Sequence, residues 1–214
     1  MRDDYQGTFL PHILPLGSTY FVTFNLFDAI PNAIMVALKR DHEQRKQAIV
    51  LSDKLYKQAL LYRETRYYFK LYDEALDKLY NGIKHLENKD LAELVKAKIF
   101  EFNGIWYNVL AVSIMPNRVH VLLDFSIQLQ PNIVATDDNY MQLDRVMKRI
   151  KGATGHDCNR LLKRSGVSFW QKESYDHYVR NEAELKRIIH YIAQNPVKAG
   201  LVKDWRDWAF TYIA

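Results

Sequence analysis

The sequence has very few of the residues that build disulfides and metal–thiolate sites. Among its 214 residues there is one cysteine, Cys158, and there are only eight glycines and six prolines. One cysteine cannot form an intramolecular disulfide or, by itself, a thiolate zinc site, so we expect a reducing compartment. No stretch approaches the roughly 18 uninterrupted apolar residues of a membrane span, and the first residues carry two acids without a signal-like apolar run. These absences predict a cytosolic protein with no membrane partner.

What the sequence does contain is typical of a folded globular chain. Hydrophobic residues make up 48% and charged residues 26%. The length suits a single domain over residues 1–214, which would bury roughly 70% of its unfolded surface. The net charge of +5 is modest, but it is unevenly distributed. From Arg145 to Arg164 there are seven basic residues and one acid, Asp157, which is +6 and leaves −1 for the rest.

The first half of the chain alternates between strand-like and helix-like patterns. Residues 19–26 (TYFVTFNL) are aromatic and β-branched, which predicts a strand. Residues 32 to about 80 carry apolar side chains at helical spacing, which predicts an insertion of two helices with solvated charges. A shorter helix is expected over 90–102, and a strand over 104–115.

Further strands and helices follow. A turn at Met115–Arg118 leads into a strand over 118–125, so the strands over 104–115 and 118–125 should form a hairpin. Residues 126–140 are expected to form a mobile loop. The helix after the loop is amphipathic, with its apolar and basic residues on opposite sides. The last helix begins at Asn181, where Glu184 completes a capping box, and should end at Pro196 and Gly200. Together these elements favour an α+β fold with an antiparallel sheet.

Two groups of polar residues are candidates for chemistry. Side chains alternate along a strand, so Arg118, His120 and Asp124 share one face. On the last helix Tyr191 and Asn195 lie one turn apart at the edge of the buried stripe, where a phenol could act as a nucleophile. The residues alone leave two other interpretations open: a hairpin with one satisfied polar face, and a tyrosine that only packs at the surface.

The chain resembles the REP-associated tyrosine transposases of the single-tyrosine HUH superfamily. Four runs carry the resemblance in the family's order: PHILPLGSTYFVTFNLFDAIP, IMPNRVHVLLDF, KRIKGATGHDCNRLLKRSGVSFWQKESYDHYVR and YIAQNPVKAGLVKDWRDW. They extend over nearly the whole chain. The resemblance implies a ferredoxin-like antiparallel sheet with helices packed on it, plus a helical insertion after the first strand.

The resemblance also implies a reaction and its residues. Members cleave single-stranded DNA near palindromic hairpins, with a helix tyrosine attacking phosphorus to leave a 5′-phosphotyrosine and a free 3′-hydroxyl. By position the nucleophile is Tyr191. The metal, Mg²⁺ or Mn²⁺, would be held by His120 and Asn195, with Asp124 or Glu184 as further candidates.

The chain departs from the family where the first histidine of the HUH motif should stand. The family reads PNHVH, whereas this sequence reads PNRVH and places Arg118 there. A guanidinium has no lone pair for a metal. Three interpretations of Arg118 stay open: decay of the nuclease, an engineered substitution, or an arginine that contacts phosphate and partly replaces the metal's charge.

Basic and aromatic residues after the loop suit contacts with nucleic acid. The predicted DNA-binding residues are Arg145, Lys148, Arg149, Lys151, Arg160, Lys163, Arg164, Trp170, Arg180 and Lys198. We expect the basic stretch to lie beside the active site. The alternative is a solvated helix with core aromatics, which applies to Trp170 above all.

The sequence therefore predicts a transposase-like single-strand endonuclease and strand transferase. Its catalytic residues would be Tyr191, His120 and Arg118, and Arg118 would impair its activity. A catalytically inactive or domesticated hairpin-binding protein is the alternative. A third hypothesis, from another class, is an interaction module formed by residues 32–80. The expected partner is single-stranded or hairpin DNA in the bacterial cytosol and nucleoid, and a monomer is favoured over a homodimer.

Overall fold

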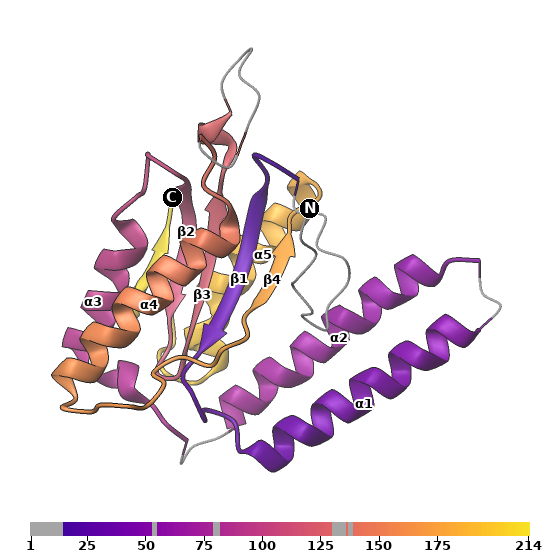
Figure 1. Cartoon of the computed structure of the whole chain (residues 1–214), viewed down its shortest axis with the longest axis horizontal. Coiled ribbons are helices and arrows are strands. Elements are labelled where there is room, and N and C mark those ends of the chain that lie inside the picture. The colour runs from indigo at the N-terminus through magenta and orange to yellow at the C-terminus, as the bar shows by residue number, and fades with distance from the viewer. Residues whose placement is uncertain (1–14, 53–54, 79–81, 130–135, 137–138) are drawn as a thin grey trace.

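A five-stranded antiparallel sheet forms the centre of the molecule (Figure 1). The computed structural model describes residues 15–52, 55–78, 82–129, 136 and 139–214. The strand order is β4-β1-β3-β2-β5. The strands are β1 (Thr19–Asn25), β2 (Asn108–Ile114), β3 (Arg118–Asp124), β4 (Tyr175–Tyr178) and β5 (Thr211–Ile213). The predicted α+β class is confirmed, and β4-β1-β3-β2 has the ferredoxin-like order with β5 added at one edge.

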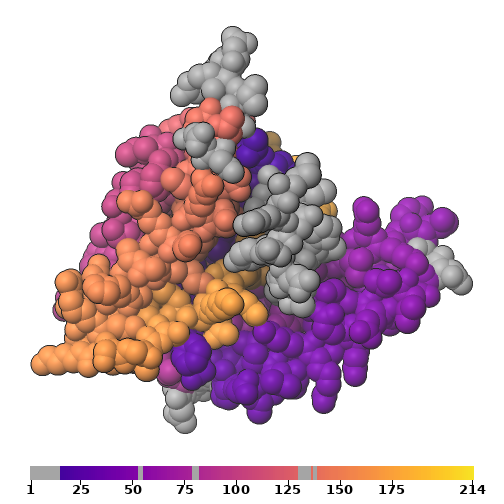
Figure 2. Space-filling model, in the orientation of Figure 1, coloured from indigo at the N-terminus to yellow at the C-terminus, as the bar shows by residue number. Residues whose placement is uncertain are grey.

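Helices cover both faces of this sheet. They are α1 (Asn32–Leu51), α2 (Lys57–Lys78), α3 (Lys89–Phe100), α4 (Leu143–Leu161) and α5 (Glu182–Lys198). Helices α3 and α4 lie on one face, and α5 lies on the other (Figure 1). Helices α1 and α2 form the predicted helical insertion after the first strand and extend away from the sheet (Figures 1 and 2).

Alternation along β3 divides its side chains between two cores. Val119, Val121 and Leu123 belong to the large core under α3 and α4, together with the apolar side of α4. Leu122 faces the other way, where it packs with Phe21 and with Ile192 of α5. The side of the sheet that carries Arg118 and His120 is therefore the side that α5 covers.

The last helix ends differently from the prediction. Pro196 lies inside α5, which continues to Lys198. A proline in the last turn loses one backbone hydrogen bond, and the helix still closes in a Schellman arrangement: the N–H of Gly200 bonds the Val197 carbonyl, and that of Leu201 bonds the Pro196 carbonyl. Gly200 has φ +70°, so its role as the stop residue is confirmed. At the other end Asn181 caps the helix by accepting from the Glu184 N–H, as predicted.

Two other predicted segments need comment. Strand β2 begins at Asn108 rather than at 104, because Gly104, with φ +78°, lies in a turn. In the loop expected over 126–140, Ser126–Gln128 form a 3₁₀ turn, and residues 130–135 and 137–138 lie outside the described residues. Residues 11–14, the start of the motif PHILPLGSTYFVTFNLFDAIP, also lie outside them. Among the described helices, none combines the length and apolar character needed to cross a bilayer.

Candidate functional site

A buried arginine lies at the centre of the predicted site. Arg118, at the start of β3, is only 1% exposed. Its Nε donates to His120 Nε2 (3.0 Å), and its Nη2 donates to Asn195 Oδ1 (2.7 Å) on α5. The guanidinium also donates to Asn117 and to Asp77. The structure thus brings together His120, Asn195 and Arg118, as the sequence predicted.

Two carboxylates from α2 complete this cluster. Asp73 and Asp77 are one helical turn apart, which puts both on the face that meets β3 and α5. Asp73 Oδ1 lies 2.9 Å from Arg118 Nε, and its Oδ2 accepts from the Tyr191 hydroxyl (2.5 Å). Lys198 Nζ lies 3.3 Å from Asp73 Oδ2 and 3.0 Å from Asp77 Oδ2.

Sequence reasoning missed these two acids. It interpreted the charges of residues 32–80 as solvated, and this is wrong for Asp73, which is 1% exposed, and for His42 and Glu64, which pair with each other in the α1–α2 hairpin. The only available signal was the i, i+4 spacing of Asp73 and Asp77, which is equally common on exposed helix faces.

The charges of the cluster balance without any further ion. Burial opposes ionisation of Asp73, but Arg118, the Tyr191 hydrogen bond and Lys198 together outweigh it and lower the pKa of Asp73 to about 2. Burial lowers the pKa of His120 to about 3, so the ring is neutral. Because Nε2 accepts from Arg118, the ring proton is on Nδ1, which donates to Thr23 Oγ1 (2.7 Å). Two cations, Arg118 and Lys198, therefore face two carboxylates.

Burial, reinforced by the Asp73 carboxylate, raises the pKa of Tyr191 well above 10. The phenol is therefore neutral, and its proton lies in the hydrogen bond to Asp73. A tyrosine in this state is a poor nucleophile until a base removes the proton.

The residues present do not fit Mg²⁺ or Mn²⁺. The lone pair of His120 Nε2 and the oxygen of Asn195 both accept from the Arg118 guanidinium, which fills the space where a cation bound by these two would lie. The other two candidate ligands have hydrogen-bond partners of their own: Asp124 accepts from Thr19 and Ser126, and Glu184 accepts from Tyr62. In the part of the chain that the structure describes, no three His, Cys, Asp or Glu side chains are grouped to hold a metal.

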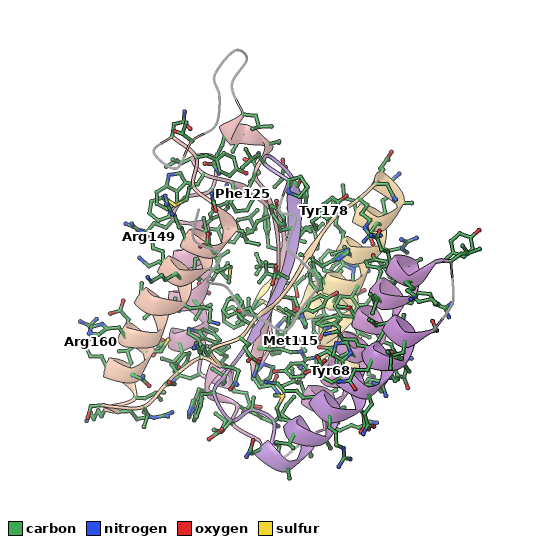
Figure 3. All side chains as sticks on the ribbon, turned by 45° about the vertical axis from the view of Figure 1, so that its right-hand side comes forward. Tyr68, Met115, Phe125, Arg149, Arg160 and Tyr178 are labelled. Carbon is green, nitrogen blue, oxygen red and sulfur yellow. The ribbon has the colours of Figure 1, made fainter. Side chains whose placement is uncertain are left out.

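The predicted basic surface lies across the sheet from Tyr191. Helix α4 packs on the face opposite to α5, so the expectation that the basic stretch adjoins the active site is wrong. The solvent side of α4 carries four exposed basic residues: Arg145, Lys148, Arg149 and Arg160. Figure 3 labels Arg149 and Arg160, which point away from the sheet. Lys163 follows, also exposed.

Several predicted DNA-binding residues make contacts within the protein instead. Lys151 Nζ donates to the Gln171 carbonyl (2.8 Å), and burial lowers its pKa to about 8. Trp170 is 6% exposed and its Nε1 donates to Thr154 (2.8 Å), so its ring belongs to the core and is not open to a base.

The remaining three predicted DNA-binding residues also have partners. Arg164 bonds His85, Arg180 lies 3.7 Å above the Tyr62 ring, and Lys198 belongs to the Asp73 cluster. Sequence position alone could not reveal these contacts, since each joins segments far apart in the chain.

A cavity of about 380 Å³ opens beside Tyr191, between α2 and α5. Aromatic, basic and acidic side chains line it, including Phe69 and Arg66 of α2 and Arg187 of α5. None of these three was predicted to take part in the site, because α2 was not expected to approach α5.

The chain is similar to known transposases over part of its length, although no protein-family model matches it. It is 28% identical over 112 residues to a Haemophilus influenzae protein provisionally named a REP-associated tyrosine transposase, which covers 49% of this chain and 58% of that protein. It is 36% identical over 64 residues to the REP-associated tyrosine transposase of Escherichia coli, covering 30% of this chain and 35% of that protein. The matches thus span from about a third to just over half of these relatives. The resemblance predicted from the sequence motifs is confirmed.

Two solved structures are similar at greater distance. One is a REP-associated tyrosine transposase bound to a REP hairpin, with 16% identity and a TM-score of 0.45 over 98% of this chain and 82% of that chain. The other is a protein from Deinococcus radiodurans, provisionally named a transposase, with 16% identity and a TM-score of 0.34 over 83% of this chain and 89% of that chain.

Proposed function

We propose that this chain is a hairpin-binding protein of the REP-associated tyrosine transposase type. In it, Arg118 occupies the place of the metal, and metal-dependent cleavage of DNA has been lost. The observation that carries the proposal is the Arg118 guanidinium, which takes up the His120 lone pair and the Asn195 oxygen. The Tyr191 phenol is at the same time neutral and bonded to Asp73. The similarity to the two curated relatives supports DNA as the ligand.

The basic side of α4 would supply the phosphate contacts. Lys148 and Arg160 are exposed on that side, within a stretch that concentrates the positive charge of the whole chain. Such contacts give sequence-independent affinity that falls as salt rises. Recognition of a hairpin would not require Arg118, since that side chain is 1% exposed and cannot reach a phosphate.

The experiment compares binding and cleavage in the same sample. A short labelled DNA hairpin with single-stranded extensions is incubated with the protein in EDTA and in Mn²⁺, and free, bound and covalently attached DNA are separated on native and denaturing gels. We expect equal hairpin binding under both conditions, weaker binding to an unpaired scrambled strand, and no covalent adduct. An adduct that forms only with Mn²⁺ and disappears in Tyr191→Phe would overturn the proposal.

A second candidate is strand cleavage without a resident metal, and it rests on the contact between Tyr191 and Asp73. The Tyr191 oxygen would attack phosphorus and form a 5′-phosphotyrosine as the bond to the 3′-oxygen breaks. Its proton would pass to Asp73, and a solvent proton would complete the 3′-hydroxyl. The pKa of Asp73, about 2, makes this carboxylate a weak base for a phenol whose pKa exceeds 10, which favours the binding function. An adduct in EDTA would identify this second candidate.

The variant Arg118→His allows cleavage to be compared directly with the wild type, because it restores the PNHVH motif and removes the guanidinium that donates to His120. If the arginine alone blocks metal-dependent cleavage, this variant forms an adduct in Mn²⁺ and the wild type does not. Equal adduct yields from both proteins would refute the role assigned to Arg118.

A further inference from the structure

Helix α4 has two glycines in its interior, and packing explains only one of them. A Cβ placed on Gly155 would meet Trp170 Cδ1 at 3.5 Å and Phe169 Cβ at 3.7 Å, so this glycine packs against the core. Gly152 is exposed, and a Cβ placed there would meet nothing within 4 Å. Glycine weakens a helix relative to alanine, and no described neighbour of Gly152 requires it. A missing side chain on an exposed face allows another molecule to approach the helix backbone closely.

Basic side chains flank Gly152 on the solvent side of α4. Arg145 and Arg149 precede it and Arg160 follows it, at spacings close to whole helical turns, so they lie on the same side of the helix. All three arginines are exposed, and Figure 3 shows Arg149 and Arg160 pointing away from the sheet. The bare backbone therefore lies between two positively charged ends, which favours an anionic partner that meets α4 at both.

The first of these ends is held in place by aromatic rings. Phe102 and Trp106 stack with their centroids 3.7 Å apart, and the Arg149 guanidinium lies 5.0 and 5.3 Å from the two centroids. Among the ion pairs of the described residues, Arg149 has no carboxylate partner, and the nearby Glu101 pairs with Lys98. An arginine that is already ordered loses little freedom on binding, and its fork of donors matches a phosphate.

The second end has one acidic neighbour. Asp157 contacts Arg160 at 3.4 Å and His156 at 3.1 Å, and Asp144 is the only other acid of α4. The Arg160 side chain is 71% exposed, so its pair with Asp157 contributes little and leaves the guanidinium open to a stronger anion.

We propose that α4 lies across the major groove of a DNA stem, with Gly152 at the point of closest approach. Arg145 and Arg149 contact phosphates on one side of the groove, and Arg160 contacts phosphates on the other. The major groove is about 12 Å wide and admits an α-helix, whereas the minor groove, about 6 Å wide, is narrower than a helix of about 10 Å. From Arg149 to Arg160 the helix rises about 16 Å, so the long side chains can reach both edges. The inference rests on the proposed hairpin-binding function and adds the place and manner of the contact.

The variant Gly152→Leu tests the close approach. Leucine forms helices better than glycine and the position is open, so Tm should equal or exceed that of the wild type. The new side chain would hold α4 away from the stem. The dissociation constant for a labelled DNA hairpin, measured by fluorescence anisotropy, should therefore rise at least about 5-fold. The matched control is Ala48→Leu on α1, another small exposed helix residue, which should bind like the wild type.

Salt dependence and chemical probing test the two flanks and the groove. Arg149→Gln and Arg160→Gln should each reduce the slope of log affinity against log salt by about 0.9, whereas Lys186→Gln, exposed on α5, should leave it unchanged. Dimethyl sulfate methylates guanine N7, which lies in the major groove. Stem guanines of the bound hairpin should be protected, and full methylation of them in a saturated complex would overturn the assignment to this groove.

The outcomes separate this inference from the proposed function. If the wild type binds the hairpin and Gly152→Leu binds it equally well, α4 does not approach the stem closely; the inference then fails, and hairpin binding by another surface stands. If the two arginine variants keep the wild-type slope, the inference fails in the same way. If the wild type does not bind the hairpin, the proposed function itself is wrong.

Discussion

Replacement of Arg118 by methionine should strongly destabilise the fold. The guanidinium lies between Asp73 and Asp77 and donates to His120 and Asn195, whereas a methionine side chain fills similar space and donates to none of them. Removal of one partner of a buried ion pair typically costs about 3–5 kcal/mol. For a chain of this length each kcal/mol lowers Tm by roughly 2–4 °C, so we expect a fall of about 6–20 °C.

A second substitution tests whether the loss of stability in Arg118→Met comes from a buried carboxylate that has lost its partner. In Arg118→Met, Lys198 is the only cation that the described residues leave paired with the buried Asp73 carboxylate, and Asp73→Asn removes the charge of that carboxylate. The double variant should therefore be more stable than the sum of the single effects by about 2 kcal/mol, within the range for residues in direct contact. Lys198→Met is the control: 44% of its side chain is exposed, so its loss should cost less than about 1 kcal/mol.

Urea unfolding at pH 7, followed by tryptophan fluorescence, measures the stability of the wild type and of all four variants. Similar m values across the series would show that the midpoints report stability rather than a changed unfolded state. A loss below about 1 kcal/mol for Arg118→Met would refute the claim that this side chain is a buried, paired cation. Additive single effects would show that Arg118 and Asp73 do not act as a pair.

Three further predictions concern pH, salt and helix capping. Arg118, the Tyr191 hydrogen bond and Lys198 together overcome burial and hold the pKa of Asp73 at about 2, below its ordinary 3.8. The contribution of the Asp73 carboxylate to stability is therefore present above pH 4 and is lost as pH falls through 2. That loss is about 2 kcal/mol, and urea midpoints should show a shallower acid decline in Asp73→Asn; parallel profiles would contradict this. Lys148→Gln should reduce the salt slope of hairpin binding by about 0.9, whereas Lys151→Met should keep the slope and lose about 1–3 kcal/mol of stability. Equal slopes for the two lysine variants would argue against their assignment. Asn181→Ala should cost about 1 kcal/mol in the same urea assay, and an unchanged midpoint would mean that the cap contributes nothing.

Local patterns in the sequence predicted most of the elements. The aromatic and β-branched run over 19–26 became β1, and the hairpin of β2 and β3 formed at the expected turn. Alternation put His120 and Leu122 on the same side of β3, opposite to Val121. Helical spacing likewise predicted the apolar side of α4. These features depend on neighbours within a few residues, so one sequence is enough to show them.

The contents of the site were only partly predictable. Sequence motifs brought Arg118, His120, Tyr191 and Asn195 together as candidates, and the structure places them in contact. Asp73 was missed, because a buried aspartate and a solvated one have the same sequence neighbourhood. Its burial depends on where α2 crosses the end of β3, and no local pattern encodes that crossing.

Placement around the sheet was the other feature that local reasoning could not supply. The basic stretch from Arg145 follows β3 and precedes Tyr191 in sequence, which suggested a shared surface. Because α4 and α5 cover opposite faces of the sheet, the basic residues of α4 and Tyr191 of α5 lie on different surfaces. Lys151, on the same helix, turns its ammonium group to backbone carbonyls near β4 rather than to solvent.

The sequence by itself determined the class of fold, the strands and helices, the transposase resemblance and the presence of an arginine where a histidine is expected. The tertiary structure alone decided what that arginine does. It does so because the charge of a buried group is set by its neighbours in space, and those of Arg118 come from α2 and α5, about 40 and 80 residues away in the chain. A departure from a motif thereby becomes a balanced, buried ion pair beside a neutral tyrosine.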